Sequence, residues 1–481
     1  MNVINRQFIC VMILFLIISL AYSMVIPAFN APDEPFHFEY IQFLALNRHL
    51  PNQTIEERSI STEGFNPPLY YMINALTLSL ISKNKASDIQ IHSYQDIVDF
   101  HRFPYQGFRS NIYPPLNPNY IKWGRGKDRN MFLTTQEDRF PFSGRIRIIH
   151  LLRIMSVLMG ALTILLIFKT AQNLLPENPN LALLATSICA FNPQFNFLSG
   201  SINNDNLVIL FATLSICLLT KFMLSEDGKT KWTVVWIGFF IGLGLITKLN
   251  IASIAVISMI GIIDVSLAER KRKFKNLIIH FILFFVPIAI TSGWYFVRNV
   301  GIYGINDPLG WRLQAIQNPG LLMPDRIRSM FFKKIFFQRL FTSFWGQFDW
   351  LTIPLPNWGY WIYGLISVMG ILGLFLFLLR RKYSRRIKIC ILLYLGAFLM
   401  ALGNLILMNF TFISAQARLI FPVLVCIGIF IGMGIASVFE YLSGRLKMKW
   451  PIAEFLFMAF LIALDVYALF WVIYPVYRSF H

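Results

Sequence analysis

Charged residues are scarce in this sequence, and acidic residues are the scarcest of them. Only 14% of the 481 residues are charged, and Asp and Glu together number 24. Charged residues make up about 25% of a typical soluble domain. Hydrophobic residues reach 56% here. This composition excludes an ordinary soluble enzyme and predicts an all-α polytopic membrane protein.

Cysteine is also rare. All five cysteines fall within apolar runs and none in an outer loop: Cys10, Cys189, Cys217, Cys390 and Cys426. This placement argues against a disulfide framework and against a thiolate metal site. Internal repeats, which many transporters show, are not visible in the sequence either.

Long apolar runs are what the sequence has in abundance. Runs of about 20 residues, the length that crosses a hydrocarbon core, predict about 11 transmembrane helices. The first run could instead be a cleaved signal peptide, with Arg6 as its basic flank, but its length favours a retained helix. The predicted spans are 8–28, 149–170, 180–199, 206–224, 232–247, 250–268, 277–297, 358–379, 389–409, 417–439 and 452–475.

The basic residues, which give the net charge of +19, lie mainly in the connections between the spans. Every second connection is basic: "KFMLSEDGKTK", "ERKRKFK", "RRKYSRRIK" and "RLKMK". Excess Lys and Arg in short loops marks the cytoplasmic side of a membrane. The pattern predicts a multi-pass protein of the bacterial plasma membrane with a cytoplasmic N-terminus. It argues against a nucleic-acid partner, which needs a basic face on a folded domain.

The long connections define the expected organisation. Residues 1–297 form a predicted transmembrane catalytic module whose first outer loop, 29–147, holds half of the acidic residues. In that loop "EPFHFEYIQFLALNRHL" predicts an amphipathic helix along the membrane surface, 66–84 predicts an interfacial or re-entrant helix, and 85–140 a substrate-facing loop. The outer loop 298–357 carries a basic, aromatic amphipathic segment, and 358–481 the C-terminal transmembrane helices.

Ionisable residues at the outer ends of spans are the candidate site residues, because charges near a bilayer are costly. For the three acids among the six candidates given below, the alternative interpretation is helix capping. For the three bases among them, the alternative is anchoring at the membrane interface. A surface position is expected for His37, although it could ligate a metal, and Asp465 is expected to pair with a neighbouring helix. The candidates are Asp33, Glu34, Asp205, Lys248, Arg298 and Arg418.

Several motifs resemble the GT-C superfamily of polytopic glycosyltransferases, which use lipid-linked sugars. Its members include lipid A aminoarabinose transferases, protein O-mannosyltransferases and oligosaccharyltransferases. "SFWGQFDWLTIPLPNW" is similar to a segment of poorly characterised bacterial members. The other matching segments are "PDEPFHFEY", "NPPLYY", "NPQFNFLSGSINNDNL", "GLGLITKLN", "WYFVRNVGIYGINDPLGW" and "QARLIFPVL".

The resemblance implies roles for the candidate residues. Asp33, with Glu34 beside it, takes the catalytic position, and Asp205 matches a second acidic corner. Lys248, Arg298 and Arg418 take positions that hold the donor phosphate. Oligosaccharyltransferases carry paired acids at the second corner, whereas this chain has Asn203, Asn204 and Asp205. The resemblance therefore leaves open whether Mg or Mn is required, with Asp33 and Asp205 as its ligands.

Residues and resemblance together predict a glycosyltransferase acting on the outer face of the membrane. It would move a hexose or pentose from a polyprenyl-phosphate donor to a glycan, lipid or protein acceptor, with inversion. Membrane lipids are the surrounding partners. Two alternatives remain open: a transporter or flippase of lipid-linked saccharides, and a non-enzymatic subunit of a polysaccharide assembly machine.

Overall fold

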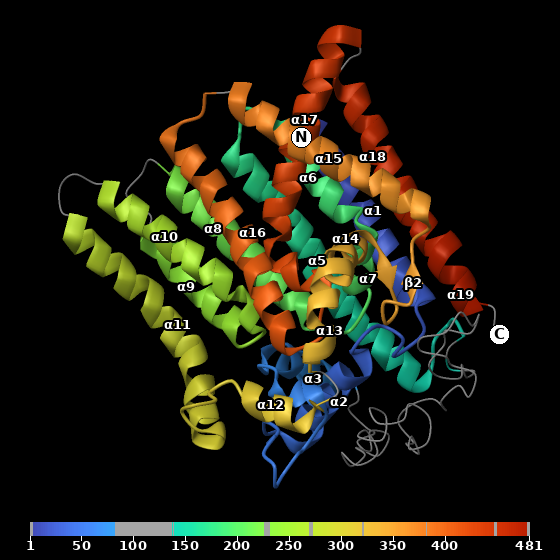
Figure 1. The fold of residues 1–481 in the computed structure, drawn as a ribbon, viewed down its shortest axis with the longest axis vertical. Helices are drawn as coiled ribbons and strands as arrows, with labels where there is room; N and C mark the ends of the chain where they lie inside the picture. The colour runs from blue at the N-terminus through green and yellow to red at the C-terminus, as the bar shows by residue number, and fades with distance from the viewer. Residues whose placement is uncertain are drawn as a thin grey trace.

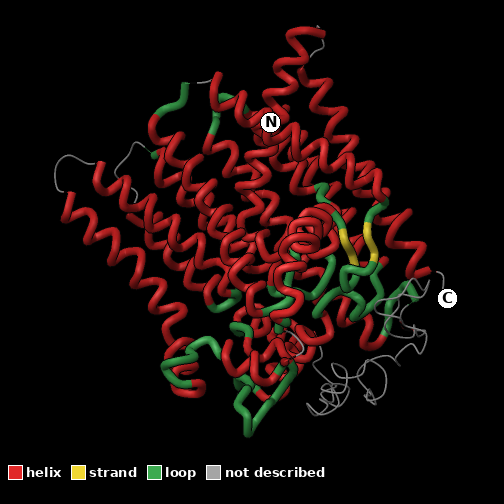
Figure 2. The backbone as a smooth tube through the Cα atoms, viewed as in Figure 1, coloured by secondary structure: helices red, strands yellow, loops and turns green. Residues whose placement is uncertain are grey.

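The computed structural model describes residues 3–81, 137, 139–225, 231–268, 273–319, 322–380, 382–446 and 450–478. Helices make up about four-fifths of this part of the chain and pack into one bundle (Figure 1, Figure 2). Two short strands, β1 (Gln347–Phe348) and β2 (Ile353–Pro354), pair as an antiparallel hairpin. The chain is therefore an all-α polytopic membrane protein, as the sequence predicts.

Nine helical stretches in the described ranges are long and apolar enough to cross a membrane, or ten if a bent pair forms one span. The bent pair is α6 (Pro179–Ala190) and α7 (Pro193–Ser199), which meet at 65°. The others contain α1 (Val3–Val25), α5 (Gly144–Leu174), α8 (Asp205–Leu224), η4 (Leu249–Ile251) with α10 (Ala252–Ala268), α11 (Lys273–Tyr303), α15 (Asn357–Arg380), α16 (Arg385–Thr411), η7 (Ala417–Val423) with α17 (Leu424–Leu446), and α18 (Trp450–Tyr467) with η8 (Ala468–Ile473) and α19 (Tyr474–Arg478).

The eleventh predicted span, 232–247, corresponds to the shorter helix α9 (Lys231–Leu245). Its 15 residues rise about 22 Å at about 1.5 Å per residue. A hydrocarbon core is about 30 Å thick, so α9 alone is short for a crossing. The predicted count of eleven is thus not confirmed, although each predicted run overlaps an apolar helix.

The first outer loop folds into α2 (Glu34–Asn47), η1 (Thr62–Phe65) and α3 (Leu69–Ile81). The prediction that α2 is amphipathic is wrong, because residues 34–44 are all buried. Its position along the membrane surface stays a prediction. Its aromatic side chains join a core cluster with α3 and α5 that covers the helix on several sides. Most of the predicted substrate-facing loop, 85–140, lies outside the described residues.

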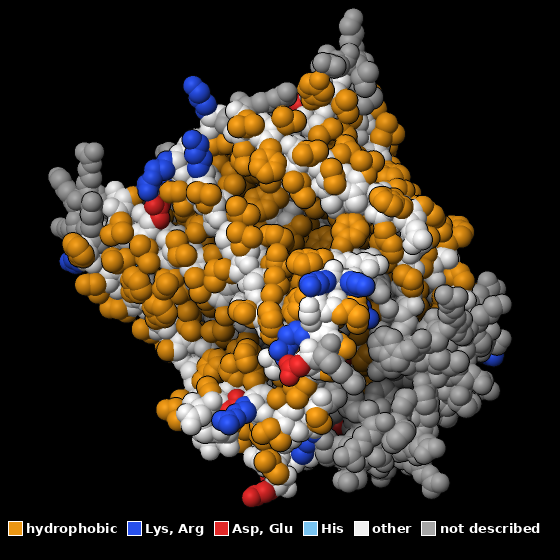
Figure 3. Space-filling view, viewed as in Figure 1, with side chains coloured by type: hydrophobic (Ala, Val, Ile, Leu, Met, Phe, Trp, Pro, Cys, Tyr) orange, Lys and Arg blue, Asp and Glu red, His pale blue; other side chains and the backbone are white. Residues whose placement is uncertain are grey.

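The second long connection contains α12 (Trp311–Gln317), α13 (Asp325–Met330), η6 (Phe331–Phe336), α14 (Phe337–Trp345) and the β1–β2 hairpin. Phe331 and Phe336 are buried, whereas Lys333 and Lys334 are exposed. Figure 3 shows basic side chains gathered over α13 and α14, below an apolar surface formed by the long helices. The segment is thus amphipathic, as its sequence predicts.

Contacts between helix ends distinguish the two ends of the bundle. At one end, Arg385 at the start of α16 pairs with Asp264 near the end of α10 at 2.7 Å. Arg386 donates to the carbonyl of Ser225, just after α8, at 2.8 Å. The opposite end therefore holds the start of α8, the α9–α10 connection and the segment after α16, which carry three of the candidate residues.

Candidate active site

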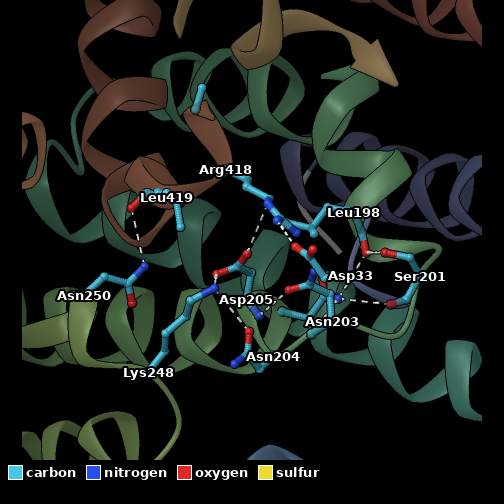
Figure 4. A network of polar contacts seen from close by, with 12 residues as sticks. Asp33, Leu198, Ser201, Asn203, Asn204, Asp205, Lys248, Asn250, Arg418 and Leu419 are labelled. Carbon is cyan, nitrogen blue, oxygen red and sulfur yellow. Dashed lines mark hydrogen bonds and ion pairs between the residues drawn. The ribbon is translucent and has the colours of Figure 1, made fainter. Parts of the chain in front are cut away.

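Four of the six candidate residues meet in one polar cluster (Figure 4). Lys248 Nζ lies 2.6 Å from Asp205 Oδ1. Arg418 donates through NH2 to Asp33 Oδ2, and its Nε lies 3.8 Å from Asp205 Oδ2. The guanidinium of Arg418 therefore joins two carboxylates that are 172 positions apart in the sequence, Asp33 and Asp205.

The backbone around Asp33 explains the direction of its side chain. Asp33 precedes α2 in a left-handed conformation, with φ of 63°, and Phe29 in the same turn has φ of 67°. Asp is among the few residues that tolerate this region. The side chain makes no capping bond to α2 and instead binds Arg418. Asp33 thus occupies the N-cap position of α2, as the alternative interpretation predicts, but its side chain does not cap the helix.

A tight polar turn presents Asp205. Asn192 caps α7 by accepting a bond from the Phe195 amide at 3.0 Å, and the chain then turns into α8. In the turn, Asn203 Oδ1 accepts a bond from the Asp205 amide at 2.9 Å. Asn204 Oδ1 accepts a bond from Lys248 Nζ at 3.2 Å. The "NND" sequence thus fixes both the acid and the lysine that pairs with it.

The cluster combines buried and accessible charges. Asp205 is fully buried, whereas the side chains of Asp33 and Arg418 are 28% and 12% exposed, and Lys248 is also partly exposed. Burial raises the pKa of Asp33, but the charges of Arg418 and Lys248 outweigh this effect, so that its pKa lies below its ordinary value. Asp33 is therefore ionised at neutral pH, and two cations lie within reach of an incoming anion.

Glu34 lies apart from this cluster in a buried ion pair. Its two oxygens accept bonds of 2.8 and 2.6 Å from Arg153, and both side chains are 0% exposed. Glu34 also accepts backbone bonds from Phe29 and Ile202, each at 2.9 Å. These contacts fasten the turn before α2 to α5 and to the turn before α8. Arg153 was missed by the sequence analysis, although a charge inside a predicted span was a usable signal.

Arg298 is the second candidate that lies elsewhere. Its NH2 group donates to the Pro51 carbonyl at 2.8 Å, and NH1 lies 3.3 Å from Asn299 Oδ1. The guanidinium thus ties the end of α11 to the first outer loop. The structure therefore brings together four of the six candidate residues, and Arg298 is not among them.

A family model described as "Predicted membrane protein (DUF2142)" matches residues 14–427. The chain belongs to this family. No curated protein matches the sequence.

Solved structures similar to this DUF2142 chain include two membrane proteins. An oligosaccharyltransferase from Archaeoglobus fulgidus, crystallised with a tethered acceptor peptide, gives a TM-score of 0.48 at 12% identity, over 98% of this chain and 54% of its own. ArnT from Cupriavidus metallidurans, bound to undecaprenyl phosphate, gives 0.46 at 12% identity, over 99% of this chain and 74% of its own. The DUF2142 chain spans about half the length of the oligosaccharyltransferase. Likeness at this level does not assign an activity.

A second group of polar residues in the DUF2142 chain adjoins the cluster and was not predicted. Tyr71 donates to Glu63 Oε2 at 3.1 Å and lies 2.9 Å from His37 Nδ1. Asn204 Nδ2 donates to the same tyrosine hydroxyl at 3.2 Å, which links the group to Lys248. The expectation that His37 lies on the surface is wrong, because α3 covers it; burial lowers its pKa to about 3.

The cluster does not fit a divalent cation. Among the described residues, no three His, Cys, Asp or Glu side chains are placed to hold a metal ion. The two carboxylates that would serve, Asp33 and Asp205, are both directed at Arg418. A cation such as Mg²⁺ requires several oxygen ligands, and a guanidinium between two carboxylates competes directly for them.

A narrow polar pocket opens beside Arg418. It lies between α7, the turn before α8 and the β1–β2 hairpin, and it is lined by Gln194, Asn203, Gln347, Asp349 and Gln416 in addition to Arg418. Amide and carboxylate groups of this kind bind hydroxyl groups. The pocket is therefore suited to bind a single hydroxyl group.

Asp465 lies away from the site, inside the bundle. It accepts bonds from Tyr22 at 2.8 Å and from Asn196 at 2.7 Å. The prediction that this intramembrane acid pairs with a neighbouring helix is confirmed, since its partners belong to α1 and α7. The contacts join the three helices α1, α7 and α18.

Proposed function

We propose that this protein is a membrane glycosyltransferase of the GT-C type that transfers a sugar from a polyprenyl-phosphate donor to a glycan, lipid or protein acceptor. The observation that carries the proposal is the Asp33–Arg418–Asp205–Lys248 cluster at one end of a helix bundle. The sequence motifs that resemble the GT-C superfamily contain these four residues, which also supports the proposal.

The two cations are the proposed phosphate-binding groups. Arg418 can offer parallel donors to phosphate oxygens, and Lys248 a compact charge. Both side chains are partly exposed and already balanced by carboxylates, so they are preorganised without a ligand. A lipid phosphate carried in the membrane would reach them from the side of the bundle.

The same charges favour sugar transfer. As the bond between the anomeric carbon and the phosphate oxygen breaks, negative charge grows on the departing phosphate, and fixed cations stabilise it. One hydroxyl group of the sugar would enter the adjacent pocket, whose amide and carboxylate groups suit hydroxyl recognition. Asp33 would orient the acceptor hydroxyl for attack from the opposite face, which inverts the anomeric centre.

The proposed location is the outer face of the bacterial plasma membrane. The site lies at the end of the bundle opposite the pair Arg385–Asp264 and the basic connection before α16. Basic connections favour the cytoplasmic side, which supports a cytoplasmic N-terminus and a site on the outer face. Glu34 and Arg298, which lie apart from the cluster, are proposed to position the outer loop rather than to contact the substrate.

Mass analysis of cell-envelope glycans tests this function. Cells lacking the protein are compared with cells that express the wild type, Asp33→Asn or Lys248→Met at equal membrane levels. We expect one saccharide mass to appear with the wild type and to be lost in both variants. Asp264→Asn, at the opposite end of the bundle, is the matched control and should retain it. Identical glycans in all strains would contradict the proposal.

A further inference from the structure

A second carboxylate, Glu63, lies beside the site and has one oxygen available. Its Oε2 is held by three contacts: a bond from Tyr71 at 3.1 Å, a bond from Asn66, and His37 Nδ1 at 3.4 Å. Within the described part of the chain, Oε1 makes no hydrogen bond, and the side chain is 14% exposed. The carboxylate is therefore fixed in orientation while one oxygen stays accessible.

Asp33 is poorly suited to take a proton. Its carboxylate is paired with Arg418, which lowers its proton affinity against the effect of burial. Efficient general bases have a pKa near the working pH. Burial and, to a smaller extent, repulsion from Asp33 raise the pKa of Glu63 to about 7. Of the two carboxylates, Glu63 is the stronger base near neutral pH.

Hydrogen bonds connect Glu63 to the proposed phosphate site. Tyr71 donates to Glu63 and accepts from Asn204, and Asn204 accepts from Lys248. The orientation of Glu63 is thus tied to the lysine that would hold the phosphate. The charges of Asp33, Lys248 and Arg418 also act on Glu63 directly. Both carboxylates therefore belong to one electrostatic unit.

We propose that Glu63 is the catalytic base that removes the proton of the acceptor hydroxyl. The acceptor oxygen bonds to the anomeric carbon, and the bond from that carbon to the phosphate oxygen breaks. The bonding pair stays on the polyprenyl phosphate, and the hydroxyl proton moves to Glu63 Oε1. This inference rests on the proposed glycosyltransferase function and assigns the proton acceptor, leaving Asp33 to orient.

The charged and titratable neighbours of Glu63 come from several elements. They are His37 and Tyr40 from α2, Tyr71 from α3, Asp33 before α2, Lys248 before η4 and Arg418 in η7. Burial keeps His37 neutral above a pH of about 3. The ionisation of Glu63 is therefore the expected source of a rise in rate around neutral pH.

The first test measures the release of undecaprenyl phosphate from a panel of undecaprenyl-phosphate hexoses and pentoses by the purified protein in lipid nanodiscs, with water as the acceptor that takes the sugar and gives its proton to Glu63. The wild-type rate should rise with pH, with a midpoint near 7. Glu63→Gln should lower kcat about 100-fold or more, as loss of a general base does, and abolish this rise. Its KM for the donor should stay close to that of the wild type. Glu56→Gln, an exposed neighbour in the same loop, should behave as the wild type.

The second test uses azide, a nucleophile that has no proton to lose. Glu63→Ala supplied with azide should release undecaprenyl phosphate and form a glycosyl azide, whereas Lys248→Met should not be rescued. Full turnover by Glu63→Gln would overturn the assignment. So would loss of turnover together with loss of undecaprenyl phosphate binding, or failure of azide rescue, because either result indicates a structural role. If the wild type releases nothing from any donor, the proposed function fails, and the assignment of Glu63 fails with it.

Discussion

The buried pair Glu34–Arg153 gives the sharpest prediction about what holds the site together. Arg153 makes two bonds to Glu34 and also donates to the carbonyls of Ser23, Ile26 and Pro27. One side chain therefore fastens the end of α1, the turn carrying Asp33 and helix α5. Removing it would leave a buried carboxylate without its ion-pair partner and would remove the side-chain bonds to three carbonyls.

The expected cost follows from burial. Removing one partner of a fully buried ion pair costs about 3–5 kcal/mol, because the other charge stays uncompensated. Total stabilities are about 5–15 kcal/mol, so Arg153→Met and Glu34→Gln should each be strongly destabilising. The double variant should cost less than the sum of the two, with a coupling of roughly 2–3 kcal/mol.

Unfolding of the purified protein in detergent, followed by tryptophan fluorescence, measures these differences. The pair Arg385–Asp264 is the matched control, because its distance of 2.7 Å is nearly that of the buried pair, 2.6 Å, while its arginine is 69% exposed. Breaking the control pair should cost about 0–1 kcal/mol. Equal costs for the two pairs would show that burial does not determine the energy of the ion pair. Glu34→Gln with unchanged stability but no turnover would instead restore the catalytic role predicted for Glu34.

Three further predictions concern other parts of the chain. Lys248→Met should weaken undecaprenyl phosphate binding about 10- to 100-fold, the loss of one charged hydrogen bond, as measured by native mass spectrometry; unchanged affinity would exclude Lys248 as a phosphate ligand. Burial raises the pKa of Glu39 to about 7, so the folded state retains a proton that the unfolded chain has lost. The corresponding stability is complete below pH 4.5 and lost as pH rises through 7, so the melting temperature should fall over this range and fall less in Glu39→Gln. A Cβ on Gly434 would clash with the carbonyl oxygen of Gly370 across the α15–α17 contact, whereas one on Gly403 would meet nothing within 4 Å. Gly434→Ala should therefore destabilise by about 1–3 kcal/mol and Gly403→Ala should not.

Hydropathy was sufficient to predict the helices, because each crossing requires about 20 apolar residues. The acids and bases at the helix ends also indicated the cluster. Charged side chains near the hydrocarbon core cost free energy, so their presence at several helix ends suggests a function. Asp33, Asp205, Lys248 and Arg418 do meet, although the longest of these separations covers 385 residues. Their catalytic and binding roles stay predictions.

Other features depend on tertiary contacts that no local pattern encodes. Asp33 and Glu34 are neighbours in sequence, yet the left-handed residue before α2 sends their side chains to different partners, Arg418 and Arg153. The polar residues of helix α2 suggested an amphipathic helix with a solvent-exposed face. In the structure, α3 and η1 cover these residues. Glu63 carried no signal of its own, because only the fold brings Tyr71 beside it.

Cleavage of a lipid-linked sugar by the purified protein is the most direct test of the central claim, that the charged cluster is the active site of a transferase. Undecaprenyl-phosphate sugars in nanodiscs are incubated with the wild type, Asp33→Asn and Arg418→Met, and free undecaprenyl phosphate is quantified by mass spectrometry. We expect release by the wild type only. Intact donor with the wild type, together with movement of that donor across the bilayer of proteoliposomes, would identify a transporter and exclude a transferase.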